Sequence, residues 1–406
     1  MRAEPLSWVV RPGPHRGNRL GWVNPSDETW RFSVNAKVLG PWRPLDLLVV
    51  ALPAALMAKV LDLGASVLFM LSALAVIPLA GLVGRSTEVL AETVGGSKGA
   101  LLNATFGNIA ELMIAALLVL NGEINILKAS ITGSIIGNLL LLLGVAMIVA
   151  AHNKSEVSIS ATSRVQATML FLAIGILLLP TVFSFRPESS TSRLDEVSGL
   201  VALILFAIYA LSMLFMLRTN RGLFGTGQSK HEEHAEGAES KQASVDEAEP
   251  RATWSVKGAL VVLGVATALV AVAAEFVASS VQEAGASLGL HSGFIGFVIL
   301  PLVGNAAEQF SALTLAAKDK LSVASEIAVG ASMQLAMLVV PVLVLLGALT
   351  GHPIGLAFSP LELTGLTMGT LLTRQLLSDG KANWLEGVML LGLYLAFAGA
   401  AFFADI

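Results

Sequence analysis

Eleven apolar stretches follow one another along this 406-residue chain, each bounded by charged residues, proline or glycine. Crossing the ~30 Å hydrocarbon core of a bilayer takes about 20 residues of helix, and nearly every stretch has that length. Only 13% of the residues are charged, whereas soluble domains carry about 25%. The chain is therefore predicted to be an all-α polytopic membrane protein with eleven transmembrane helices. The stretches lie near residues 45–62, 66–84, 101–120, 126–151, 166–185, 198–217, 258–280, 292–316, 324–349, 354–373 and 383–403.

The lysine and arginine residues indicate how these helices are oriented. With the N-terminus on the cytoplasmic side, 21 of the 25 basic residues fall in cytoplasmic segments and four in the opposite ones. Basic residues accumulate in the short cytoplasmic loops of membrane proteins. We therefore expect a multi-pass integral membrane protein with a cytoplasmic N-terminus and an external C-terminus. The lack of a recognisable targeting segment and the short loops favour a bacterial plasma membrane.

The composition restricts the partners and the chemistry. A net charge of −4 argues against a nucleic-acid partner, which basic surfaces attract, so the lipid bilayer is the expected surrounding. Because the chain has no cysteine, disulfides, thiolate metal sites and cysteine nucleophiles are excluded. No resident cofactor is expected, and nothing in the sequence indicates an oligomeric state.

Two sequence features recur at the same spacing. The motif Gly-Asn-Ile-Ala-Glu at residues 107–111 returns as Gly-Asn-Ala-Ala-Glu at residues 304–308, and Gly133 in the following helix returns as Gly330. Both pairs are offset by 197 residues, which indicates an internal duplication. Each copy has an odd number of helices, five, so the second copy enters the membrane from the opposite side. This is the inverted-repeat plan of secondary transporters.

The duplication divides the chain into five segments. We expect a cytoplasmic tail at 1–43, a transmembrane helix at 44–64, a first five-helix repeat at 65–217, an acidic cytoplasmic linker at 218–255 and a second five-helix repeat at 256–406. The linker carries seven acidic residues against one lysine between positions 231 and 249. It is either a solvated, flexible connection or an element that attracts cations.

Two glutamates are the main candidates for a functional site. Glu111 and Glu308 lie well inside apolar helices, where a charge costs a few kcal/mol and marks a functional residue by default. Asn108 and Asn305 each stand three residues before a glutamate and therefore share its helical face. Carboxylate and amide oxygens are the ligands that Ca²⁺ prefers. The sequence therefore predicts that the two glutamates bind a transported metal, Ca²⁺, with help from the asparagines.

Charge balance predicts the mechanism. Two bare carboxylates in a low dielectric are costly, so the pair should hold either one divalent cation or two protons. Gly107 and Gly304 precede the asparagines, at positions where a helix can break and expose backbone carbonyls. Mutually exclusive occupancy at one site with alternating access is antiport. We therefore expect proton-coupled calcium antiport, with Ca²⁺ and H⁺ as substrates rather than cofactors, and no enzymatic activity.

The residues around the glutamates resemble the signatures of the calcium/proton exchanger family. The run Gly-Ala-Leu-Leu-Asn-Ala-Thr-Phe-Gly-Asn-Ile-Ala-Glu at 99–111 is similar to the first signature, and residues 304–308 are similar to the second. Residues 133–138 and 330–341 resemble the helices that follow. The resemblance covers about residues 66–400. It implies an eleven-helix antiporter of the cation/calcium exchanger superfamily that exchanges Ca²⁺ for H⁺.

The resemblance also implies a set of site residues. The two glutamates would bind the cation and the protons, with Asn108 and Asn305 as helpers. Polar residues of the following helices would complete the site or a proton path, or else form hydrogen bonds between helices. These residues are Ser134, Asn138, Ser332 and Gln334. Glu88 and Glu275, toward the ends of their helices, resemble vestibule carboxylates, with solvated or structural roles left open.

Three positions depart from the pattern of that family. Gln309 follows the second motif where the family usually has histidine, and Gly137 and Ala331 stand where serine is expected. These differences bear on the details of coordination and on metal selectivity.

Other functions fit parts of the pattern. The nearest is a sodium- or proton-coupled antiporter of another cation, such as Mn²⁺ or Na⁺, although the run before Gly107 argues against sodium coupling. An intramembrane aspartyl protease normally needs two aspartates, and no predicted helix has one at its centre. A channel is the third alternative, but an inverted repeat with broken helices favours alternating access.

Overall fold

The computed structural model describes residues 44–95, 99, 102, 105–186, 191–218 and 255–403. The predicted N-terminal tail and all but the ends of the predicted acidic linker lie outside these residues, as does part of the first signature motif.

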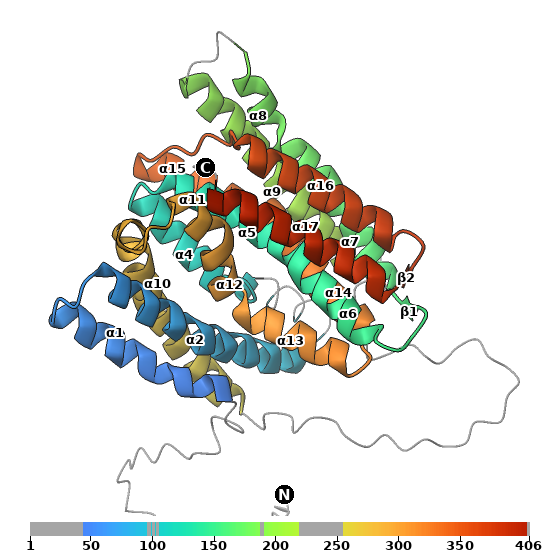
Figure 1. Ribbon diagram of the computed structural model, residues 1–406, viewed down its shortest axis with the longest axis horizontal. Coiled ribbons are helices and arrows are strands. Elements are labelled where there is room, and N and C mark those ends of the chain that lie inside the picture. Colours follow the sequence, from blue (N-terminus) through green and yellow to red (C-terminus); the bar gives the residue numbers. More distant parts are fainter. Residues whose placement is uncertain are drawn as a thin grey trace, which may run out of the picture. The chain divides into compact units, whose positions relative to one another are not determined.

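The described chain is almost entirely helical (Figure 1). Before the linker, the elements are η2 (Pro44–Val50), α1 (Ala51–Val60), α2 (Ala65–Val94), α4 (Ile109–Leu120), α5 (Ile124–Ile136), η3 (Gly137–Leu142), α6 (Leu143–Ala150), β1 (Val157–Ser158), α7 (Ala161–Leu177), α8 (Leu179–Ser184) and α9 (Thr191–Arg218). After it, they are α10 (Val256–Leu288), α11 (Ser292–Phe294), η4 (Ile295–Ile299), α12 (Leu300–Gly304), α13 (Ala306–Ala317), α14 (Leu321–Gln334), η5 (Leu335–Val339), α15 (Val340–Thr350), α16 (Pro360–Leu377), β2 (Lys381–Ala382) and α17 (Trp384–Phe403). η2 is a 3₁₀ helix, whereas η3, η4 and η5 are π-helical turns.

Seven helices in the described part of the chain are long and apolar enough to cross a membrane. These are α2, α5 to α6, α7 to α8, α9, α10, α14 to α15 and α17. The two helices on either side of Asn305, bent by 61° relative to each other, pass the same test only when taken together, as a broken span or a re-entrant loop. The chain is therefore a helical polytopic membrane protein. The total of eleven spans stays a prediction, because α1 and α4 have only 10 and 12 residues and α16 is not among the seven.

The elements on the two sides of the linker recur at the offset that the sequence contains. α13 begins and ends 197 residues after α4, and α14 begins 197 residues after α5. The π-helical turns η3 and η5 interrupt the helices that follow at nearly corresponding places. Such turns are rare and often occur at functional sites. The inverted orientation of the two repeats stays a prediction.

One predicted helix begins later than expected. The stretch near 354–373 becomes helical only at Pro360, which follows a serine N-cap with a capping box, and both features favour a helix start. Residues 354–358 form neither helix nor strand and are in part buried. Two of their backbone N–H groups donate to Ser198 Oγ at 2.9 Å and to Thr181 Oγ1 at 3.1 Å. These bonds satisfy buried backbone groups that a helix would otherwise pair.

Loops that are distant in the sequence meet at the ends of the helices. β1 pairs with β2 in an antiparallel ladder, and Lys154 forms an ion pair with Asp319 at 2.5 Å. At another such place, Gly122 lies beside His352, and a Cβ added at the glycine would be 3.7 Å from the histidine ring. Each of these contacts joins two loops that the distribution of basic residues assigns to one side of the membrane. The sidedness itself stays a prediction.

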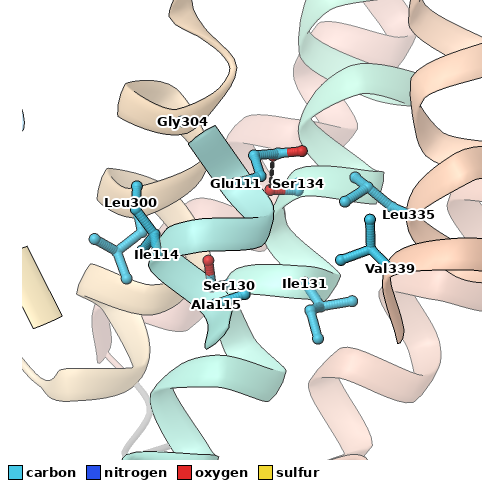
Figure 2. A pocket seen from close by; sticks show the side chains of 10 residues that line it. All are labelled: Glu111, Ile114, Ala115, Ser130, Ile131, Ser134, Leu300, Gly304, Leu335 and Val339. Atoms are coloured by element: carbon cyan, nitrogen blue, oxygen red, sulfur yellow. Dashed lines mark hydrogen bonds between the residues drawn. The ribbon is translucent and has the colours of Figure 1, made fainter. Parts of the chain in front are cut away.

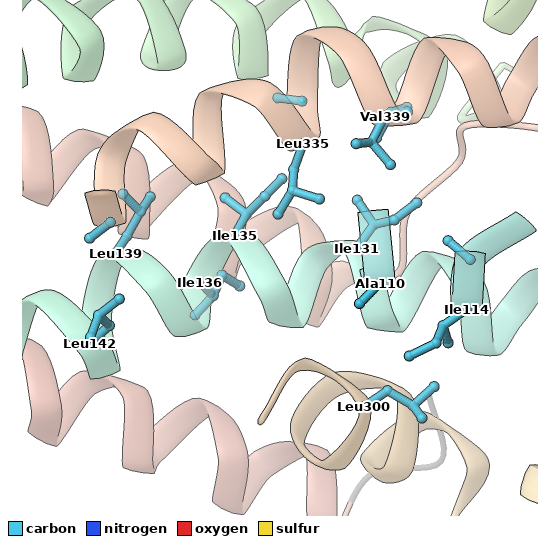
Figure 3. Close-up of a cluster of buried hydrophobic side chains, with 14 of the residues drawn as sticks. Ala110, Ile114, Ile131, Ile135, Ile136, Leu139, Leu142, Leu300, Leu335 and Val339 are labelled. Atoms are coloured by element: carbon cyan, nitrogen blue, oxygen red, sulfur yellow. The ribbon is translucent and has the colours of Figure 1, made fainter. Parts of the chain in front are cut away.

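Two helices form the centre of the molecule. The span from α5 to α6 is 78% buried and the span from α14 to α15 is 72% buried, whereas α9 and α17 are each 28% buried. Figure 3 shows apolar side chains of α4, α5, α12 and η5 meeting around these helices. This packing surrounds the motif residues of α4.

Candidate cation-binding site

The two sequence motifs lie at helix starts. Asn108 is the N-cap of α4 and Asn305 is the N-cap of α13. Glu111 and Glu308 lie in the first turns of these helices, where the positive end of the helix dipole favours a negative charge. α12 ends at Gly304, and the chain bends by 61° before α13. The helix break therefore presents both an amide and a carboxylate.

The asparagine side chains bond across the two halves of the chain. An N-cap asparagine usually accepts a backbone N–H of its own helix, but neither Asn108 nor Asn305 does so. Asn305 Nδ2 donates to Ser134 Oγ at 3.2 Å, and Asn108 Nδ2 donates to Gln334 Oε1 at 2.8 Å. Each bond therefore joins a residue before the linker to one after it.

Glu111 is held from two sides. Ser134 Oγ donates to Glu111 Oε1 at 2.7 Å (Figure 2), a hydrogen bond that is strong because the acceptor can carry charge. The same hydroxyl accepts from Asn305, so it links one glutamate to the opposite asparagine. A Cβ at Gly304 would lie 3.0 Å from Glu111 Cγ. Glycine at this position therefore lets the broken helix approach the carboxylate closely.

Glu308 lies in the first turn of α13, at the place that corresponds to Glu111 on α4. As a residue it is half-buried, but its Oε2 is buried and has no hydrogen-bond partner among the described residues. The two carboxylates of the candidate site therefore differ in their partners.

Four buried oxygens at this site lack a hydrogen-bond partner in the described part of the chain. They are Oδ1 of Asn108, Oδ1 of Asn305, Oε2 of Glu111 and Oε2 of Glu308. Leaving one buried polar atom unpaired costs about 1–3 kcal/mol, so these four acceptors are open to a hydrogen-bond donor or a cation. All four are hard oxygen ligands of the kind that Ca²⁺ takes.

Amides are needed to complete such a site. Within the described ranges, no three side chains of His, Cys, Asp or Glu lie together in a way that could hold a metal ion. Two carboxylates alone provide too few ligands for Ca²⁺, which takes about six to eight oxygens. The asparagine oxygens, backbone carbonyls and water would provide the others.

A small cavity lies beside Glu111 and Ser134 (Figure 2), with about 10 Å³ of space for the centre of a water molecule. This is close to the smallest volume that holds one water. Most of the other lining residues are apolar, among them Ile114, Leu300 and Val339. Sequence reasoning missed these residues. Ile114 follows Glu111 by three positions and so shares its helical face, which was the available signal.

The family follows from comparison with known proteins. Residues 64–218 and 258–403 match the family model described as "Sodium/calcium exchanger protein". This chain belongs to that family. The match confirms the predicted resemblance to cation exchangers, and it makes the chain a member of a family of transporters rather than of enzymes.

The relatives cover nearly the whole chain. A "Ca(2+)/H(+) antiporter" of Aphanothece halophytica is 38% identical over 363 residues, which are 88% of this chain and 96% of the relative. A protein of the same name from Synechocystis sp. is 37% identical over 361 residues, with the same two shares. The solved structure of native YfkE superimposes with a TM-score of 0.74 at 30% identity, covering 89% of this chain and 100% of YfkE.

Three other predicted residues of this exchanger have distinct surroundings. Gly107 lies in the turn before Asn108. Asn138 is fully buried in η3, and neither of its side-chain polar atoms has a partner in the described ranges. Ser332 is also fully buried, but its hydroxyl donates to the backbone carbonyls of Ala328 at 3.0 Å and Ile135 at 3.4 Å. Ser332 therefore bonds to backbone, on the two central helices, rather than to a motif side chain.

The predicted vestibule carboxylates lie on the helices next to the site. Glu88 is exposed on α2 and Glu275 is half-buried on α10, and these two helices pack along each other. Neither is among the residues that line the cavity beside Glu111. Their role at a vestibule stays a prediction.

Proposed function

We propose that this protein is a proton-coupled calcium antiporter in which Glu111 and Glu308 bind either Ca²⁺ or protons. The observation that carries this proposal is the group of four buried oxygens without partners at the starts of α4 and α13. The relatives named Ca(2+)/H(+) antiporter support the same pair of substrates.

The two loading states have the same charge and satisfy the same atoms. One Ca²⁺ neutralises the two carboxylates, and two protons do so as well. A bound Ca²⁺ takes the free oxygens as ligands. A protonated carboxyl instead becomes a donor and can satisfy a neighbouring amide oxygen. Because an uncompensated buried charge is costly, the site exchanges one load for the other, which is antiport.

Alternating access requires that the site open to one side at a time. The apolar side chains around the cavity, among them Ile114, Leu300 and Val339, are almost fully buried and close the site on their side. We propose that two inverted five-helix repeats, 65–217 and 256–406, rock against each other to move this closure. The recurrence of α4 and α13 at 197 residues supports the repeats.

The same proposal sets the protein in its membrane. The N-terminus is cytoplasmic, the C-terminus is external, and α1 precedes the two repeats in a bundle of eleven helices in a bacterial plasma membrane. The contacts between β1 and β2 and between Lys154 and Asp319 support this topology, because they join loops assigned to one side.

A flux assay tests the function. The purified protein in liposomes should take up Ca²⁺ when a pH gradient is imposed, and it should do so without sodium. Lowering the pH on the side from which Ca²⁺ binds should raise the Ca²⁺ concentration for half-maximal uptake without lowering the maximal rate, because protons compete for the same site. Uptake of Ca²⁺ that needs a sodium gradient, or uptake of Mn²⁺ but not Ca²⁺, contradicts the proposal.

Charge-removing variants test the residues. Glu111→Gln and Glu308→Gln should each reduce uptake to the level of empty liposomes, because one Ca²⁺ can no longer be neutralised. Glu283→Gln makes the same chemical change at an exposed position of α10 and should leave uptake unchanged. Undiminished proton-driven uptake by both site variants refutes the assignment.

A further inference from the structure

The two halves of the site hold their asparagines with different residues. At the offset of 197, Ser134 corresponds to Ala331, and Gly137 corresponds to Gln334. The polar residue that contacts an asparagine therefore stands three positions later in the second half than in the first. Three positions are about one helical turn, so Gln334 lies on the same helix face one turn farther along than a serine at 331.

The contacts follow this shift. In the first half, Ser134 accepts from Asn305 at 3.2 Å and donates to Glu111 at 2.7 Å. In the second half, Gln334 accepts from Asn108 at 2.8 Å. Ala331 has no polar side-chain atom and can do neither. The asparagine has kept a partner, whereas the glutamate of the second half has lost its hydroxyl donor.

The partner decides which end of the asparagine faces the ion. A carboxamide has an oxygen and an NH₂ group of nearly equal shape, so it fits its place in two orientations. When a neighbouring acceptor engages the NH₂ group, the oxygen remains free. Both asparagine oxygens are buried and free among the described residues, and both NH₂ groups are engaged.

We propose that Gln334 is a positioning residue that replaces, one turn farther along α14, the part of the role of Ser134 that orients an asparagine. The other part, a hydroxyl donor to the glutamate, has no replacement at position 331. Glu111 therefore offers the ion one oxygen while Ser134 holds the other, whereas no hydroxyl at position 331 holds an oxygen of Glu308. The inference rests on the proposed function and makes the site unequal in its two carboxylates.

Moving the polar residue back tests the proposal. Gln334→Ala should raise the KM for Ca²⁺ up to about tenfold with kcat little changed, as expected for one lost hydrogen bond. Gln334→Met, of similar size, should do the same without leaving a cavity. Ala331→Ser/Gln334→Ala restores the arrangement of the first half and should return the KM to within about threefold of the wild type.

The reciprocal exchange gives a second test. The Cβ of a residue at position 137 would have no described atom within 4 Å, so a side chain can leave the backbone there without overlap. Ser134→Ala should raise the KM more than Gln334→Ala, because it removes two hydrogen bonds. Ser134→Ala/Gly137→Gln should recover only part of this loss, since glutamine replaces the partner of Asn305 but not the hydroxyl on Glu111.

A structural role would give a different pattern. Thr370→Val removes a buried hydroxyl that bonds only within α16 and should leave the KM unchanged. The rise in Tm that Ca²⁺ causes should shrink in Gln334→Ala and recover in the double variant, because a ligand stabilises in proportion to its binding. An unchanged KM in both single variants of Gln334, or double variants no better than their singles, overturns the positioning role. Wild-type protein without proton-driven Ca²⁺ uptake overturns the proposed function and this inference together.

Discussion

Replacing Gly133 with alanine should push α5 and η4 of the exchanger apart. A Cβ at this position would lie 2.0 Å from the carbonyl oxygen of Phe297, 2.6 Å from its carbonyl carbon and 2.8 Å from its Cα. All three atoms belong to the backbone of η4, so no change of rotamer relieves the overlap. Carbon atoms pack best at about 3.5–4.0 Å. α5 and η4 must therefore move apart by about 1 Å or more.

This displacement affects both stability and the site. Inserting a methyl group into a well-packed core costs about 1–3 kcal/mol, and we expect the upper end because backbone is displaced. The next residue, Ser134, holds Glu111 at 2.7 Å, and η4 leads through α12 to Gly304, which packs against the same carboxylate. A shift of about 1 Å takes this bond beyond normal hydrogen-bond length. Uptake should therefore fall at least tenfold in Gly133→Ala.

A glycine one turn away provides the matched control. A Cβ at Gly137 would meet no described atom within 4 Å, and alanine in a helix is about 0.5–1 kcal/mol more stable than glycine. Gly137→Ala should therefore keep or slightly raise the Tm in detergent and keep Ca²⁺ uptake in liposomes. If Gly133→Ala unfolds at the wild-type temperature and transports normally, or if both variants lose stability equally, the packing argument is wrong.

Two further predictions concern ion pairs away from the site. Asp46 and Arg85 form two hydrogen bonds at 2.7 and 3.1 Å, and their side chains are only 10% and 15% exposed. Asp46→Asn should therefore lower the stability measured by thermal unfolding by about 3 kcal/mol, because it leaves the charge of Arg85 unpaired. Asp46→Asn/Arg85→Met removes that charge and should lower the stability less, and equal losses in the two variants contradict this reasoning. A hydrogen bond to Glu156 raises the pKa of Lys381 above its ordinary value. The bond therefore stabilises the protein at neutral pH, and this stabilisation is lost as the pH rises through the raised pKa of the folded state. The Tm difference between wild type and Lys381→Met should accordingly shrink as the pH rises through the alkaline range, and a difference that grows there contradicts this origin.

The fold was predictable from the sequence where it depends on local composition. A long apolar stretch predicts a helix, and α2, α9 and α10 cover the expected stretches 66–84, 198–217 and 258–280, although each helix is longer than its stretch. The segment at 354–358 was predicted to be helical because it is apolar, but it forms neither helix nor strand. The backbone of this segment bonds to the side-chain hydroxyls of Thr181 and Ser198, which are 158–177 residues away in the sequence. No local pattern contains that information.

The candidate site residues could be named from the sequence, but the hydrogen bonds between them could not. A spacing of three residues assigns Asn108 and Glu111 to one helix face, and the offset of 197 identifies Asn305 and Glu308 as their counterparts. The sequence does not reveal that Ser134 bonds to both Glu111 and Asn305 or that four oxygens remain free.

The sequence by itself therefore determined most of the helical, apolar segments, which residues are duplicated and which two acids lie within apolar helices. Those properties depend on neighbours within one or two turns. The tertiary structure decided how each amide is oriented and which carboxylate has a hydroxyl donor. The bond of Asn305 joins residues 171 positions apart, and the bond of Asn108 joins residues 226 positions apart. A hydrogen bond acts only at about 3 Å, so its partner is known only when distant helices have been packed against each other.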